Sequence, residues 1–177
     1  MLETGIGQSL SEFNSTPNIL RRDTGLRFGD AVAAIIVTDD GRYLMQLRDD
    51  KPGIFYPGHW GFFGGGVDPG EDEETALRRE LFEELNFIPD KIRFFTRMNF
   101  DLHQFGFGNC YRVFYEMRIT LEELDRFTLG EGSGMESIGI AALLMERRLV
   151  PYDSFALWMH YYFGNCSVLN GRPGFQY

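Results

Sequence analysis

Cysteine is scarce in this chain, where Cys110 and Cys166 are the only two among 177 residues. Two cysteines do not make a disulfide framework, so both are predicted to be reduced thiols. Long apolar runs are missing as well: none reaches the roughly 18 residues of a membrane span, and the amino terminus lacks the basic and then apolar pattern of a secretory signal. These absences predict a cytoplasmic protein with no membrane partner.

Basic residues are also in short supply, with 17 lysines and arginines against 26 acidic residues and a formal net charge of -9. Duplex nucleic acid binds largely through basic side chains that neutralise its phosphates, so this balance argues against such a partner. An anionic small molecule remains compatible with the charge if metal ions offset the repulsion.

Internal repeats and low-complexity tracts are absent from the sequence, and its length suits one domain with a single sizeable core. The first 28 residues are polar and show no sustained periodicity, which predicts an amino-terminal extension. The predicted domain therefore covers residues 29–177.

Short apolar runs alternate with turn residues and helical patterns in the remainder of the chain. Residues 31–37 and 43–47 flank turn residues and predict a hairpin, and residues 72–85 predict a helix that ends at a left-handed Asn86. Such a mixture predicts a mixed sheet covered on both faces. Further strands are expected at 92–95, 98–102 and 111–119, a flexible loop at 131–134, and helices at 140–149 and 154–163 separated by Pro151.

The predicted helix 72–85 carries Glu80, Glu83 and Glu84 on one arc of roughly 100°, beside a stripe of leucines. Glu-rich helix faces are most often solvated surface. In a cleft, however, like charges three and four residues apart repel unless a divalent cation lies between them. Hard carboxylate oxygens suit Mg²⁺ or Mn²⁺, so the arc is a candidate metal site.

A triplet of glycines, 64–66, precedes this helix. Glycine removes side chains where a backbone must approach a ligand or a metal, although three glycines alone also suit a simple turn. The fixed distance between the triplet and the acidic arc makes the combination informative.

Taken together, the segment Gly65-x5-Glu71-x7-Arg79-Glu80-Leu81-Phe82-Glu83-Glu84-Leu85-Asn86-Phe87 resembles the Nudix box of the Nudix (MutT-like) hydrolases. The family pattern is Gly-x5-Glu-x7-Arg-Glu-apolar-x-Glu-Glu-x-Gly-apolar, and every defined position matches except Asn86, where the family usually has glycine. Asparagine tolerates the left-handed conformation best among the other residues, so the departure is mild. The resemblance implies an α/β fold, namely an α/β/α sandwich with a mixed β-sheet and the box helix on one face.

By position in the box, the resemblance implies that Glu80, Glu83 and Glu84 bind Mg²⁺ or Mn²⁺, with the Gly64 carbonyl as a further ligand. Arg79 matches the position that, together with Glu71, holds the loop and the helix together, and it is counted among the residues on which catalysis depends.

Many family members take another acid from a later loop, as a metal ligand or as the general base. Glu131 resembles that position best and Glu136 is the second choice. The base is therefore left open between Glu83, Glu131 and Glu136.

The implied reaction is attack of an activated water on phosphorus of a nucleoside diphosphate linked to another moiety, such as a nucleotide sugar, an ADP-ribose-like compound or a (d)NTP. Two alternatives remain, namely a sugar-nucleotide hydrolase that acts at carbon and a non-catalytic ligand sensor with the same fold. The intact set of box acids argues against both alternatives.

Residues outside the box select the substrate, and here only candidates emerge. Arg48 and Lys51 are expected to meet a phosphate tail. Substrate identity and homodimer formation stay open at this stage. The candidates for base stacking are Trp60, Phe100, Phe107 and Tyr152, whereas His59, His103 and His160 are expected to have structural or surface roles.

Overall fold

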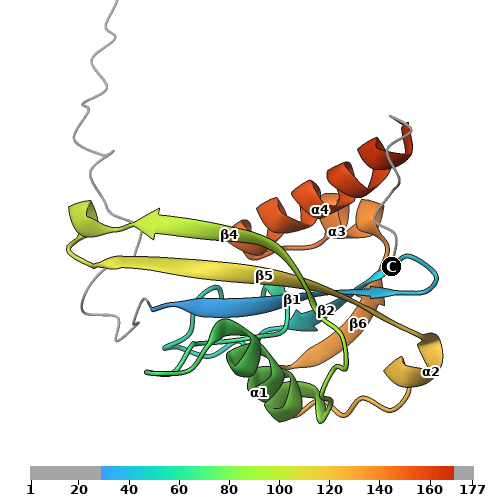
Figure 1. The fold of residues 1–177 in the computed structure, drawn as a ribbon, viewed down its shortest axis with the longest axis horizontal. Helices are drawn as coiled ribbons and strands as arrows, with labels where there is room; N and C mark the ends of the chain where they lie inside the picture. The colour runs from blue at the N-terminus through green and yellow to red at the C-terminus, as the bar shows by residue number, and fades with distance from the viewer. Residues whose placement is uncertain (1–28, 170–177) are drawn as a thin grey trace, which may run out of the picture.

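The computed structural model describes residues 29–169, so the predicted extension 1–28 lies outside the described residues. A six-stranded mixed sheet forms the middle of three layers, with one helix on one face and two on the other (Figure 1). The α/β sandwich with a mixed sheet is therefore confirmed. Its elements are β1 (Ala31–Thr38), β2 (Tyr43–Leu47), β3 (Trp60–Gly61), α1 (Glu73–Leu85), β4 (Arg93–Asp101), β5 (Asn109–Ile119), α2 (Leu121–Leu124), β6 (Gly134–Ile138), α3 (Ile140–Glu146) and α4 (Pro151–Leu169).

The strand order is β3-β2-β1-β5-β4, and β6 pairs with β2. The central pair, β1 and β5, is parallel over the full length of β1, while the other pairs are antiparallel. Because β1 is covered on both faces, its residues from Val32 to Val37 are all buried, which explains their continuous apolar run.

The predicted hairpin forms, but β1 and β2 pair only beside their turn, at Ile36–Leu44 and Val37–Tyr43. Farther from the turn the two strands diverge, and the segment from Trp60 to Gly66 lies between them. Its residues pair with β2 through β3 and with β1 through bridges at Phe63 and Gly66. This insertion places the glycine triplet against the first residues of β1.

Helix α1 ends as its sequence predicts and begins one residue later than expected, at Glu73. Asp72 caps its first turn by accepting a hydrogen bond from the Thr75 N–H, and Asn86 ends it at φ 52° and ψ 40°, in the left-handed region. The buried face contains Leu77, Leu81 and Leu85, which pack on the sheet beside Phe63 and Tyr115. Burial of this stripe orients the acidic arc of the helix toward the glycine triplet.

The opposite face of the sheet is covered by α3 and α4. Ala156, Leu157 and Leu143 contribute to its core against Phe62 and Phe114 of the sheet. No helix within residues 29–169 has the length and apolar character needed to cross a membrane.

Four expectations about elements were wrong. The strands expected at 92–95 and 98–102 are one strand, β4, interrupted by a bulge between Phe94 and Thr96. Residue 134, expected in a flexible loop, begins β6, whose sequence GMESI has little apolar alternation and forms a strand because β2 offers a free edge. Pro151 begins α4 rather than preceding it, since the first turn of a helix needs no proline N–H. The helix expected at 140–149 ends at Glu146.

The cap of α1 supports a first prediction. Replacing Asp72 with alanine leaves the Thr75 N–H without its acceptor at 3.0 Å and should lower the free energy of unfolding by about 1 kcal/mol. Urea denaturation followed by circular dichroism measures the change. Asp90→Ala, at another exposed aspartate, is the control, and equal stability of the two variants would contradict the capping role.

Candidate active site

Glu84 is the most buried acid of the α1 arc, with only 5% of its surface exposed. Its Oε2 accepts a hydrogen bond from the Gly64 N–H at 2.7 Å, and its Oε1 accepts one from Gln46 Nε2 at 2.9 Å. Burial raises the pKa of this carboxyl to about 7, and the charges of Glu80 and Glu131 raise it further against the two hydrogen bonds. Within residues 29–169 the ionised form of Glu84 has no basic side chain within ion-pair distance.

Glu80, one turn earlier, is held by Arg79. The Arg79 guanidinium lies 2.7 Å from Glu80 Oε1, donates two hydrogen bonds to Glu71, and donates a third to the Gly66 carbonyl at 2.9 Å. Burial raises the pKa of Glu80 although Arg79 opposes that rise. Arg79 therefore ties the loop before α1 to the helix and fixes the position of one acid of the arc.

Glu83, the third acid of the arc, is open to solvent, with 57% of its side chain exposed and Arg79 at 3.6 Å. Its environment differs from that of its two neighbours because the apolar stripe covers only one edge of the arc. A solvent-facing carboxylate at this place is accessible to a water molecule and to an incoming ligand.

The loop before β6 brings Glu131 to the same region. Gly130 N–H donates to the Glu84 carbonyl at 2.7 Å, and Gln46 Nε2 donates to the Glu131 carbonyl at 3.1 Å. The charge of Glu131 acts on both Glu80 and Glu84 by raising their pKa values.

Glu136, by contrast, pairs with Met45 in the sheet and forms an ion pair with Arg147 at 3.1 Å. Met45 belongs to the core on the face opposite α1, and paired residues of antiparallel strands share a face. The structure therefore places Glu131, and not Glu136, beside the acidic arc.

The glycine triplet supplies backbone groups to this cluster. The carbonyls of Phe63 and Gly65 accept hydrogen bonds from β1, whereas no described residue donates to the Gly64 carbonyl. A Cβ atom built on Gly65 would lie 2.4 Å from Glu80 Oε2, so only glycine leaves room for that carboxylate.

In the part of the chain that the structure describes, no three acidic, histidine or cysteine side chains converge closely enough to enclose a metal ion. Glu80 is instead paired with Arg79, and Glu84 accepts hydrogen bonds from Gly64 and Gln46. The donor set nevertheless fits a hard divalent cation, because it offers carboxylate oxygens, a carbonyl without a donor and a buried acid that lacks a cationic partner.

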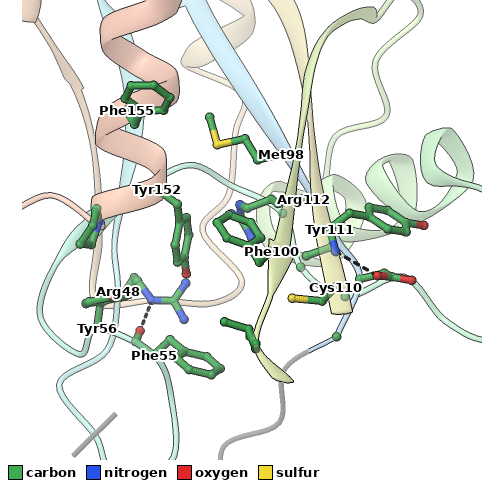
Figure 2. Close-up of a pocket in the computed structure, with 18 residues that line it drawn as sticks. Arg48, Phe55, Tyr56, Met98, Phe100, Cys110, Tyr111, Arg112, Tyr152 and Phe155 are labelled. Carbon is green, nitrogen blue, oxygen red and sulfur yellow. Dashed lines mark hydrogen bonds between the residues drawn. The ribbon is translucent and has the colours of Figure 1, made fainter. Parts of the chain in front are cut away.

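A cavity of about 690 Å³ opens beside the glycine triplet (Figure 2). It lies on the α4 side of the sheet and is lined by Gly64–Gly66, by the start of β1, by β4 and β5, by the loop after β2 and by the first turns of α4. Its lining is mostly apolar and aromatic, which is typical of a small-molecule site. The acidic cluster and the cavity thus share the glycine backbone as their common wall.

The predicted substrate residues separate in the structure. Arg48 lines the cavity and donates from Nε to the Phe55 carbonyl at 2.8 Å (Figure 2). Lys51 does not line the cavity; its side chain is 53% exposed and is paired with Asp49 at 2.7 Å. Of the candidate aromatics, Phe100 and Tyr152 line the cavity whereas Trp60 and Phe107 do not.

The histidines behave as expected. His160 is buried between Tyr43 and Glu116, with its ring nitrogens 3.0 Å from an oxygen of each. His59 contacts the Pro57 carbonyl, and exposed His103 contacts Asp101.

Three residues of the site were missed from the sequence. Gln46 holds the Glu84 carboxylate and the Glu131 loop, and Arg112 and Asp153 form a buried ion pair at the cavity, with 3.2 Å between Nε and Oδ1. Each is a polar residue inside an otherwise apolar segment, which marks it as unusual in the sequence. This pattern does not identify the residue that the side chain contacts in the folded protein.

Comparison with known proteins identifies the domain that carries this site. A family model for the NUDIX domain matches residues 27–159. The nucleoside triphosphatase NudI of Escherichia coli is 52% identical over 50 residues, which cover 28% of this chain and 35% of that protein. The chain thus matches about a third of the length of these curated relatives.

Solved structures share the fold. The MutT protein from Methanosarcina mazei Go1 has a TM-score of 0.62 at 19% identity, covering 75% of this chain and 91% of that one. The NUDIX domain of Shewanella oneidensis NrtR, complexed with ADP ribose, has a TM-score of 0.60 at 18% identity, covering 87% and 97%. At such identities the likeness concerns the fold alone.

Proposed function

The chain belongs to the Nudix family, and on that basis we propose that it hydrolyses a nucleoside diphosphate linked to another moiety in a reaction that depends on Mg²⁺ or Mn²⁺. The observation that carries this proposal is the shared wall formed by Gly64–Gly66, with the box acids on one side and the cavity on the other. A nucleotide in the cavity would present its diphosphate to the acids.

Glu80, Glu84 and the Gly64 carbonyl are the proposed metal ligands, joined by the exposed Glu83 and by Glu131 from the loop before β6. A divalent cation, when bound, supplies charge neutralisation of the diphosphate and lowers the pKa of water. Two neighbouring groups keep these ligands in place, because Arg79 orients Glu80 and Gln46 holds both Glu84 and the Glu131 loop.

The chain's own residues supply the remaining chemistry. Glu131 or Glu83 accepts a proton from the attacking water. The water oxygen bonds to phosphorus, and the bridging P–O bond breaks with its electron pair leaving on the bridging oxygen. Both are exposed, as a base that exchanges protons with solvent requires; Glu83 belongs to the arc and Glu131 lies beside it. Arg48, at the cavity wall, offsets negative charge on the bound nucleotide.

The match to NudI makes nucleoside triphosphates the first substrates to test. We expect (d)NTP hydrolysis in Mg²⁺ or Mn²⁺ that stops when EDTA is added and returns when the metal is restored. Product analysis by ion-exchange chromatography, with nucleotide sugars, ADP-ribose and dinucleoside polyphosphates in the same panel, identifies the class. Binding of these compounds without turnover of any would favour a ligand sensor instead.

Attack at phosphorus is separable from attack at carbon by hydrolysis in ¹⁸O-labelled water. The proposal expects the label on a phosphate product. Label found only on the sugar of a nucleotide-sugar substrate would replace it with the sugar-nucleotide hydrolase that acts at carbon.

A further inference from the structure

Arg112 presents a cation at the inner wall of the cavity. It lies on β5, between Ala31 of β1 and Met98 of β4, and its side chain is 11% exposed. Asp153, which is 1% exposed, lies behind it with Oδ1 3.2 Å from Nε, and the guanidinium carbon is 4.9 Å from the centre of the Tyr152 ring. The group is therefore held both by a charge and by an aromatic ring.

The terminal nitrogens of Arg112 remain available. Among the side chains that the structure describes, residues 29–163 without residue 105, and among the described carbonyls, none accepts a hydrogen bond from them. The buried side-chain atoms without a hydrogen-bond partner include Arg112 Nε but not these terminal nitrogens. A guanidinium has five N–H donors and no acceptor, so a ligand group placed there must be a hydrogen-bond acceptor. Figure 2 shows the Arg112 side chain pointing from β5 toward Tyr152, with Phe100 overlapping it in this view.

Aromatic side chains line the cavity near Arg112. Phe100 and Tyr152 approach it from β4 and from α4, and Tyr56, with its backbone at φ 50°, closes the wall beside Arg48. A non-glycine residue in this conformation is a form of strain that functional sites retain. Aromatic walls favour stacking of a nucleobase, and the glycine triplet at the other wall is where the diphosphate is proposed to lie.

We propose that Arg112 reads the edge of the nucleobase and selects bases with a carbonyl at that edge, guanine and uracil or thymine, over bases with an amino group there, adenine and cytosine. Guanine O6 and N7 and thymine O4 are acceptors, whereas adenine N6 and cytosine N4 are donors. An amino group would place donor against donor beside a guanidinium whose side chain is only 11% exposed. This selectivity rests on the proposed function of the neighbouring acids.

Matched substrate pairs isolate the one group that matters. GTP and UTP should be hydrolysed with kcat/KM about tenfold to a hundredfold above ATP and CTP respectively. ITP keeps O6 and lacks the 2-amino group, so it should behave like GTP. The triphosphate of 2-aminopurine riboside keeps the 2-amino group and lacks O6, so it should behave like ATP.

Arg112→Gln tests the residue, because an amide both donates and accepts and should reduce each ratio to within about threefold. Arg97→Gln is the matched control: Arg97 also lies over a tyrosine ring, 3.6 Å from Tyr111, and pairs with a carboxylate, but it does not line the cavity. The control should keep both ratios.

Loss of Arg112 leaves the buried carboxyl of Asp153 without its cation, and burial already raises the pKa of that group. If Arg112→Gln fails to fold, the double variant Arg112→Gln/Asp153→Asn removes both charges together, and its ratios decide the question. The amide introduced by Asp153→Asn keeps an oxygen for the Phe62 N–H, which donates to Asp153 at 3.1 Å.

Calorimetric titration with GMP, AMP, UMP and CMP in EDTA separates this inference from the proposed function. Tighter binding of GMP than AMP, and of UMP than CMP, would support base selection if Arg112→Gln abolishes both differences. This result would hold even if no triphosphate were hydrolysed. Equal hydrolysis of the four triphosphates would leave the hydrolase intact and overturn base selection. A base preference that survives Arg112→Gln would overturn base selection as well. So would inorganic phosphate that displaces all four nucleotides equally from Arg112.

Discussion

Replacing Glu84 with glutamine should lower kcat by about 10²- to 10³-fold while the protein keeps its fold. The variant loses the carboxylate charge at the most buried position of the acidic arc, next to Gly64. Burial raises the pKa of the carboxyl to about 7, so the ionised form opposes folding and a neutral amide does not. The folded-state pKa of Glu84 is raised from 4.5 to about 7. The stability of the parent protein therefore falls as pH rises from 4.5 to about 7, where Glu84 becomes ionised. The amide of the variant keeps one acceptor, so its NH2 group meets one of the two donors, Gly64 N–H or Gln46 Nε2. This loss offsets the relief of the buried charge, so at pH 8 the melting temperature of the variant should stay close to that of the parent.

Steady-state kinetics in Mg²⁺ and thermal denaturation in EDTA check the two parts of this prediction separately. Glu74→Gln is the matched control, because Glu74 lies on the same helix, is exposed, and approaches Arg78 only to 3.9 Å. It should leave both activity and stability close to the parent values. Full activity in Glu84→Gln would remove Glu84 from the metal site.

Alanine substitutions along the glycine triplet should have three different outcomes, although each adds the same single methyl group. Gly64→Ala should lower the free energy of unfolding by about 3 kcal/mol or more. Its backbone has φ 125°, and the new Cβ would lie 2.4 Å from the Val32 carbonyl oxygen in a rigid strand. This variant is expected to express poorly.

Gly65→Ala should fold but lose activity, by about 10- to 100-fold. The conflict is with the flexible end of Glu80, whose Oε2 would lie 2.4 Å from the new Cβ, so the carboxylate moves and the protein backbone does not. Gly66→Ala is the control for stability, since no protein atom lies within 4 Å of the added carbon. Chemical denaturation and kcat measurements on all three variants test these outcomes. A stability loss in Gly65→Ala as large as that in Gly64→Ala would contradict the prediction that only the Glu80 carboxylate moves.

Local chemistry explains what was predictable in α1. The leucine repeat and the asparagine terminator act over three or four residues, and the structure reproduces both features. Asp72, expected inside the helix, is instead its amino-terminal cap. The resemblance of the box to a known family likewise depends on spacing within one segment, and the family match over residues 27–159 confirms it.

Features that depend on distant partners were predicted less well. Strand β6 forms only because β2 has an unpaired edge, and the bulge that bends β4 depends on its pairing with β5. Glu131 and Glu136 look equivalent in sequence, yet the two-residue period of a strand directs Glu136 to the face with Arg147. Local pattern could not separate these two acids.

By itself, the sequence determined the α1 helix with its asparagine terminator, the spacing of its acids from the glycine triplet, and hence the family and the class of chemistry to expect. Only the tertiary structure decided which acid is buried, which loop acid approaches it, and that Arg112 and Asp153 meet at the wall of a cavity. The reason is physical: helix caps and periodicity arise from contacts within a few residues, whereas burial and pairing join residues that are far apart in sequence. The Gln46–Glu131 and Phe62–Asp153 contacts, for example, span 85 and 91 residues.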